Sequence, residues 1–143
     1  MPASEQQIDE LIRAMGLLVR RVRAAGTGEQ LSLTEAMVLA RLDRDGPLTS
    51  ADLARAEGMK PQSMGTTVSA LEDAGLVERT PHPTDGRQML VAVTPKGHEA
   101  RRRSKDAKRQ WLAKVVAQLS DHDREALLGV TGILRRMAER QEL

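Results

Sequence analysis

One segment, from Thr80 to Thr94, constrains the fold of this chain more than any other: TPHPTDGRQMLVAVT. Its Pro and Gly residues favour a turn, and the alternation of apolar residues that follows predicts a strand. Asp85 and Gly86 suit a tight hairpin turn, because Gly tolerates positive φ and Asp hydrogen-bonds its own backbone. The overlapping run LVERTP predicts the partner strand. The sequence therefore predicts a β-hairpin that holds Arg87 near its tip.

Two helices separated by a tight turn are predicted just before this hairpin. Thr49 can cap a short helix over 50–57, and Gly58 suits its C-terminal end. Pro61 is placed at the first position of a longer helix over 61–74, where a missing N–H costs nothing. This arrangement is the layout of a helix-turn-helix.

Two further helices are predicted before this pair. Apolar residues over 8–22 recur every three or four residues, as on one face of a helix, and the GTG run at 26–28 would end it. Ser32 and Glu35 form a capping box that opens the next helix. The inward residues of that second helix would be Val38, Leu39 and Leu42.

Helices are also predicted after the hairpin. Thr94 and Pro95 suit the start of a long helix, and Ser120 and Asp123 suit the start of a final one. Between Lys96 and Lys114, eight basic residues stand against two acidic ones. This excess indicates either a polyanion partner or a solvated helix face. The inward residues of the final helix would be Leu127, Val130, Leu134 and Met137.

The composition is that of a globular domain. The 143 residues fit one domain, with 40% apolar and 29% charged residues. The chain has no Cys, which excludes disulfides, thiolate metal sites and thiol redox switches. No apolar run is long enough to span a membrane, and the N-terminus is unlike a secretory signal, so we expect a cytoplasmic protein. With one Trp and no Phe or Tyr, the core must be aliphatic.

Three strings in this order, LTSADLA, LEDAGLVER and DGRQMLVAVT, resemble the MarR family of bacterial and archaeal transcription regulators. The last string is similar to the wing signature of the family, in which Asp-x-Arg precedes a strand ending in Leu-Thr. Here Val93 and Thr94 end the strand, which is a mild departure. The resemblance covers nearly the whole chain, because the family also has helices before and after the winged helix.

The resemblance implies a mainly α fold with a small β-hairpin wing (α+β), in a single domain over 1–143. The winged helix-turn-helix core would span about 31–94. Helices at about 5–25 and 95–143 would form a homodimer. Each protomer would place the 61–74 helix in a major groove of double-stranded DNA and its wing on the adjacent minor groove. A two-fold symmetric dimer implies a pseudo-palindromic operator.

The candidate DNA-binding residues come from the recognition helix and from the wing. With Met64, Val68 and Leu71 packed inward, the opposite face carries short polar side chains that can hydrogen-bond base edges or phosphates. A merely solvated polar face is the alternative interpretation. The candidates are Gln62, Ser63, Thr66, Ser69, Asp85 and Arg87.

The resemblance also implies an effector pocket between the dimerisation helices and the winged helix. Trp111 could line that pocket or pack in the dimer core. A cavity with few aromatics is a poor host for phenolic compounds, an effector class common in the family. Two functions compete: a repressor that a small-molecule effector releases, and a ligand-independent DNA-binding or architectural protein. A winged helix that binds another protein is a more distant third. The candidate effector residues are Met15, Met37, Arg41 and Trp111.

Neither catalysis nor a cofactor is predicted. The sequence shows no nucleophile with a local base and no Gly-rich phosphate loop, so we expect no enzyme activity. His82, His98 and His122 are too scattered for a metal motif, and no metal site is expected. His82 lies between two prolines, where we expect a solvated loop histidine.

Overall fold

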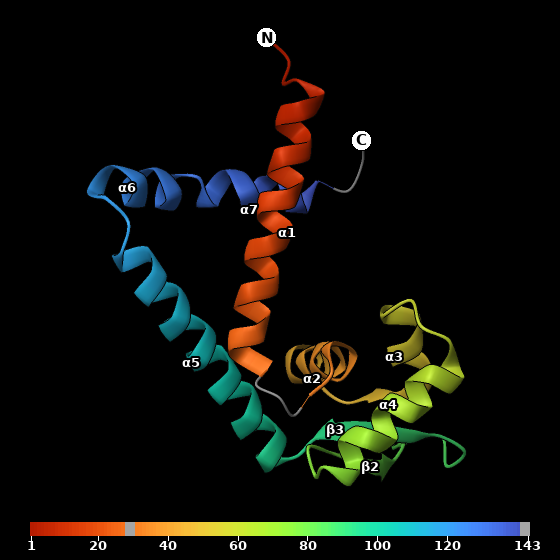
Figure 1. The fold of residues 1–143 in the computed structure, drawn as a ribbon. Helices are drawn as coiled ribbons and strands as arrows, with labels where there is room; N and C mark the ends of the chain where they lie inside the picture. Colours follow the sequence, from red (N-terminus) through yellow and green to blue (C-terminus); the bar gives the residue numbers. More distant parts are fainter. Residues whose placement is uncertain (28–30, 141–143) are drawn as a thin grey trace. The chain divides into compact units, whose positions relative to one another are not determined.

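The computed structural model describes residues 1–27 and 31–140 (Figure 1). The chain forms two compact units, residues 1–108 and residues 109–143. The expected mainly α fold with a small antiparallel sheet is confirmed. The elements of the first unit are α1 (Glu5–Thr27), α2 (Leu33–Asp45), β1 (Leu48–Thr49), α3 (Ser50–Ala56), α4 (Pro61–Asp73), β2 (Val77–Pro81), β3 (Met89–Val93) and most of α5 (Pro95–Ala117).

The small sheet has the strand order β1-β3-β2, with both pairs antiparallel. The sequence predicted the hairpin of β2 and β3 but not β1, which pairs Leu48 with Val91. A strand of two residues is too short to show an alternating pattern. In β2, Val77 pairs with Val93 and Arg79 with Val91. The helices α2 and α4 pack against each other and against this sheet, which completes a winged helix (Figure 1).

The core of the winged helix is aliphatic, as the absence of Phe and Tyr predicted. Residues from α2, α3, α4, β2 and β3 share a single cluster, so the hairpin and the helix pair depend on one another. All three inward residues predicted on α2, and all three on α4, are buried. The buried residues are Val38, Leu39, Leu42, Leu53, Ala54, Met64, Val68, Leu71, Leu76, Val77 and Val91.

The predicted helix caps are present. Ser32 accepts a hydrogen bond from the Glu35 N–H at 3.1 Å, and Thr49 accepts one from the Asp52 N–H at 3.0 Å. The side-chain hydrogen bond with Thr49 and then that with Arg55 lower the pKa of Asp52. These caps set where α2 and α3 begin.

The junction between the winged helix and α5 is unusually close. Gly97 donates to the Thr94 hydroxyl at 3.0 Å, and that hydroxyl donates to the Gly75 carbonyl at 2.6 Å. A Cβ on Gly97 would lie 2.1 Å from the carbonyl oxygen of Leu76. Only glycine therefore allows the first turn of α5 to lie against the turn between α4 and β2.

The second unit consists of the end of α5 with α6 (Asp121–Gly129) and α7 (Thr131–Glu139). Ser120 caps α6 by accepting from the Asp123 N–H at 3.1 Å, as predicted. The prediction of one uninterrupted final helix is wrong, because the chain breaks at Val130. Gly129 and the β-branched Val130 and Thr131 have low helix propensity, and together they weaken the helix there.

Arg124 closes the turn between α5 and α6. Its guanidinium donates to the carbonyl oxygen of Leu119 at 3.0 Å and to those of Val116 and Ala117 at 3.4 Å. It also pairs with Asp121 at 2.9 Å. A cation at the last carbonyls of a helix satisfies acceptors that the helix itself cannot.

Apolar side chains remain exposed on both α1 and the two C-terminal helices. The expected stripe on α1 includes Ile12, which is 59% exposed, and Leu18, which is 44% exposed. The residues predicted to face inward on the final helix are likewise exposed in the single chain. These residues are Leu127, Val130, Leu134 and Met137.

Candidate nucleic-acid interface

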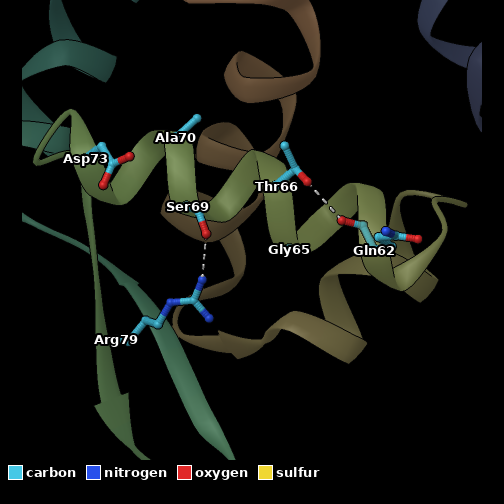
Figure 2. A pocket seen from close by; sticks show the side chains of 7 residues that line it. All are labelled: Gln62, Gly65, Thr66, Ser69, Ala70, Asp73 and Arg79. Carbon is cyan, nitrogen blue, oxygen red and sulfur yellow. Dashed lines mark hydrogen bonds between the residues drawn. The ribbon is translucent and has the colours of Figure 1, made fainter.

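The outer face of α4 is polar and exposed. Its N-terminus begins at Pro61, and the predicted polar residues are all exposed, on the side opposite the buried Met64 and Val68. Thr66 donates to the carbonyl oxygen of Gln62 at 3.2 Å, which keeps its hydroxyl against the helix (Figure 2). A Cβ on Gly65 would meet nothing within 4 Å. A ligand could therefore approach the helix backbone closely at this position. The four polar residues are Gln62, Ser63, Thr66 and Ser69.

A shallow concavity of about 600 Å³ lies along this face. Figure 2 shows the helix residues on one side of it and Arg79, from β2, on the other. Arg79 donates to the Ser69 hydroxyl at 3.3 Å, and its Nε lies 3.5 Å from a carboxylate oxygen of Glu72. The lining residues are Gln62, Gly65, Thr66, Ser69, Ala70, Asp73 and Arg79.

Sequence reasoning missed Arg79 as a part of this face. The alternation of strand residues indicates only which side of β2 Arg79 lies on, since residues two apart lie on the same side of a strand. Val77 is buried beneath α4, which places Arg79 on the side of β2 that faces this helix. The predicted DNA-binding residues came from α4 and from the tip of the wing, and none came from the strand β2 between them.

The wing loop spans residues 82–88 and is longer than the tight turn that we expected. The Gln88 N–H donates to the Asp85 carbonyl oxygen at 3.1 Å, which closes a turn over 85–88. Gly86 does not adopt a positive φ, so a glycine is not required for this turn. The longer loop places Arg87 on an exposed turn of its own.

Asp85 positions Arg87 through the backbone. Its carboxylate accepts a hydrogen bond from the backbone N–H of Arg87 at 3.0 Å. The Arg87 side chain is exposed at the tip of the wing. The structure thus brings the two predicted wing residues into one turn, at the end of β2 and β3.

His82 is part of the wing, which corrects the expectation of a solvated loop histidine. Its ring is half-buried, and its Nδ1 accepts from the backbone N–H groups of Thr84 at 3.2 Å and Asp85 at 3.1 Å. The backbone N–H of His82 donates to the Gln88 carbonyl oxygen at 3.1 Å. The ring therefore ties the backbone of residues 84 and 85 to the start of the wing loop.

The comparisons with known proteins agree with this geometry. The sequence model of the MarR family matches residues 31–89. The HTH-type transcriptional repressor Rv2887 of Mycobacterium tuberculosis is 33% identical over 119 residues, covering 82% of this chain and 86% of the relative. The chain belongs to the MarR family. It is a transcriptional regulator of that family.

Two solved structures share the fold of this MarR-family chain. The crystal structure of Rv1404 from Mycobacterium tuberculosis has a TM-score of 0.82 at 28% identity and covers 98% of both chains. The structure of BpsR from Bordetella bronchiseptica has a TM-score of 0.64 at 22% identity and covers 99% of this chain and 100% of the other. Its description attributes regulation of DNA binding to 6-hydroxynicotinic acid.

Of the candidate effector residues of this MarR regulator, Met15 lines a cavity within the first unit. This cavity of about 590 Å³ includes Met15, but not the other three candidates, among its lining residues. Met37 is exposed, and Trp111 is half-buried in the second unit. The lining residues are Met15, Gly16, Val19, Arg20, Arg23 and Leu33.

Arg41, the fourth candidate effector residue, makes contacts within the winged helix. Its guanidinium pairs with Glu57, at the end of α3, and with Asp45 at 3.2 Å. The hydrogen bond with Glu57 is the main cause that raises the pKa of Arg41. An arginine held in this way ties α2 to α3, and an effector would have to compete with both carboxylates.

The described residues contain neither a helix that could span a membrane nor a cluster of side chains that could hold a metal ion. Within residues 1–27 and 31–140, no helix is long and apolar enough to cross a membrane. The same residues contain no group of three or more His, Cys, Asp or Glu side chains that could hold a metal ion.

Proposed function

We propose that this MarR-family chain is a homodimeric, cytoplasmic repressor that binds a pseudo-palindromic operator in double-stranded DNA. In this proposal the whole chain acts as one MarR-like domain without enzyme activity. The observation that carries the proposal is the outer face of α4, which is polar and exposed beside a wing that presents Arg87. The helix has the shape and chemistry to enter a major groove, with the wing lying on the adjacent minor groove.

The recognition face of α4 would read DNA through short polar groups. Gln62, Ser63, Thr66 and Ser69 can donate or accept hydrogen bonds with base edges and phosphates. Residues near the N-terminus of a recognition helix are the ones that contact bases, so we assign base contacts to Gln62 and Ser63. The open space at Gly65 supports a close approach of the helix to the groove.

The wing would contribute an arginine to the minor groove. A·T-rich minor grooves are narrow and strongly negative, and they attract arginine side chains. Arg87 is exposed, and its backbone is held by Asp85. A guanidinium on an ordered turn loses less conformational entropy on binding than one on a loose loop.

A dimer would cover the apolar residues that the single chain leaves exposed. Ile12 and Leu18 on α1, with Leu127 and Leu134 on the C-terminal helices, supply apolar surface on two separate elements. Exposed apolar surface of this extent marks an interaction site. A two-fold homodimer is the commonest way in which such surfaces pair, and it matches the two half-sites of an operator.

Release by a small-molecule effector is the regulatory part of the proposal. The relative Rv2887 is described as a repressor, and DNA binding by BpsR is regulated by 6-hydroxynicotinic acid. The cavity beside Met15 joins apolar residues to Arg20, which suits an anionic ligand with an apolar body. Met37, Arg41 and Trp111 are proposed only as additional contacts of the effector. The alternative is a ligand-independent DNA-binding or architectural protein of the same fold.

The test is Arg87→Ala, because it removes the wing contact without touching the core. We expect a loss of ~1–3 kcal/mol of operator binding, the range of a good groove contact, with an unchanged thermal melt. Arg44→Ala is the matched control, since it removes the same charge from an exposed pair with Asp45. The measurement is a DNA titration of both variants at one salt concentration. An early melt with normal binding by the folded fraction would make Arg87 a structural residue.

A further inference from the structure

The C-terminal end of α4, the proposed recognition helix, carries negative charges that are unfavourable next to DNA. The α4 sequence, PQSMGTTVSALED, contains no basic residue and ends with Glu72 and Asp73, both exposed. Carboxylates that face a DNA backbone repel its phosphates. If α4 enters a groove, a cation from another element has to offset these charges.

Arg79 is the basic side chain that reaches this end of the helix. It comes from β2, crosses to the outer face of α4 and is the basic residue in the lining of the concavity (Figure 2). The contacts shown for its guanidinium in the described part of the chain are one hydrogen bond to Ser69 and one ion pair with Glu72. Because a guanidinium has five N–H donors, most of its donors remain available for a ligand.

The bonds that hold Arg79 are long, and its side chain is partly open to solvent. The two distances are 3.3 and 3.5 Å, and 31% of the side chain is exposed. Ion pairs of this kind contribute little to stability. They do restrict where the guanidinium points, and here they aim it along the face of α4 beside the Ser69 hydroxyl.

We propose that Arg79 and the Ser69 hydroxyl together bind one phosphate of the operator backbone, at the edge of the groove that α4 enters. The proposal rests on the proposed function. On binding, the guanidinium exchanges the Glu72 carboxylate for the phosphate, and the serine hydroxyl donates to a second phosphate oxygen. Arginine suits this role because its planar fork matches phosphate geometry.

The position along the helix favours a phosphate over a base. Ser69 and Glu72 lie in the second half of α4, whereas base contacts come mainly from the first turns of a recognition helix. A phosphate contact fixes the register of the helix but carries no sequence information. The contribution of Arg79 should therefore be the same for operator and non-operator DNA.

The experiment is a DNA titration of Arg79→Ala over a range of salt concentrations, with the operator and with a duplex of permuted sequence. Loss of one phosphate contact should weaken both by roughly tenfold and lower the slope of log affinity against log salt by about one. Arg44→Ala is the control, and its slope should equal that of the wild type. Arg79→Lys should recover most of the slope, because it restores the charge.

The results that would overturn the proposal are distinct. Weaker binding to the operator alone would make Arg79 a base-reading residue, and an unchanged slope would remove it from the interface. An earlier thermal melt with unchanged DNA affinity would mean that Arg79 only stabilises the packing of β2 against α4. Wild-type protein that shows no preference for any duplex would refute the proposed function itself. If the wild type prefers the operator and Arg79→Ala binds DNA as tightly as the wild type, only the phosphate contact is refuted.

Glu72→Gln gives a second, independent test of the proposed exchange. If Arg79 leaves Glu72 for the phosphate, this substitution removes the carboxylate charge that competes for the guanidinium and tightens DNA binding. The gain should be larger in the wild-type background than in the Arg79→Ala background. Equal gains in the two backgrounds would mean that Glu72 acts only through its own charge, and the exchange that we propose would be wrong.

Discussion

At the scale of single residues, Gly97 shows how one missing methyl group positions a whole helix. An added Cβ would lie 2.1 Å from the Leu76 carbonyl oxygen and 2.7 Å from Cγ1 of Val93. Because the nearest atom belongs to the backbone, relief requires that α5 move away from the winged helix. The Thr94 hydroxyl, which joins Gly75 to Gly97, would then lose its geometry as well.

Gly97→Ala should destabilise the protein by about 1–3 kcal/mol, the usual cost of overpacking. Gly86→Ala is the matched control, since a Cβ there would meet nothing within 4 Å and its φ is not positive. Urea unfolding of both variants at one protomer concentration gives the comparison. Equal free energies of unfolding for Gly97→Ala and Gly86→Ala would mean that the start of α5 does not pack closely against the winged helix in solution.

The residues that sequence reasoning found and missed differ in a physical way. Gln62, Ser63, Thr66 and Ser69 follow from helix periodicity alone, which is a local property, and the structure places them on the exposed face of α4. Arg79 belongs to this face only because β2 packs against α4. No pattern within a strand states which helix covers it.

At the scale of elements, local signals placed most helix boundaries. Ser32, Thr49 and Ser120 are N-caps as predicted, since a capping hydrogen bond spans only three residues. The sequence did not predict β1, which depends on pairing with β3. It also did not predict the break at Val130, because an apolar periodicity that continues through a weak point hides the interruption.

In the wing, one side chain holds the backbone of the loop. His82 accepts two backbone N–H groups and lies close enough to α3 to add a small lowering of the Asp52 pKa. His82→Ala leaves both N–H groups without this acceptor, so amide hydrogen exchange at Thr84 and Asp85 should accelerate. His82→Asn keeps an oxygen near the position of Nδ1 and should restore most of the protection.

The wing variants should also separate order from DNA contact. Operator affinity should fall for His82→Ala and recover in part for His82→Asn, because Arg87 sits on the turn that His82 supports. Unchanged exchange at Thr84 in His82→Ala would show that the loop holds its shape without the ring.

At the scale of the whole molecule, dimerisation should depend on the apolar C-terminal helices. Leu127→Glu combined with Leu134→Glu places two carboxylates among exposed apolar residues, so we expect monomers in light scattering and much weaker operator binding. Gln118→Glu adds a carboxylate elsewhere in the same unit and should leave the dimer intact. A double variant that stays dimeric would place the interface on another surface.

The central claim is that two copies of this winged helix bind two related half-sites, and footprinting on DNA fragments selected from the genome tests it most directly. The account predicts protection of two half-sites in inverted orientation, centred about one helical turn, ~34–36 Å, apart. Both half-sites should be filled at the same protein concentration, because a dimer delivers both recognition helices together. A single asymmetric half-site at full occupancy would contradict the account.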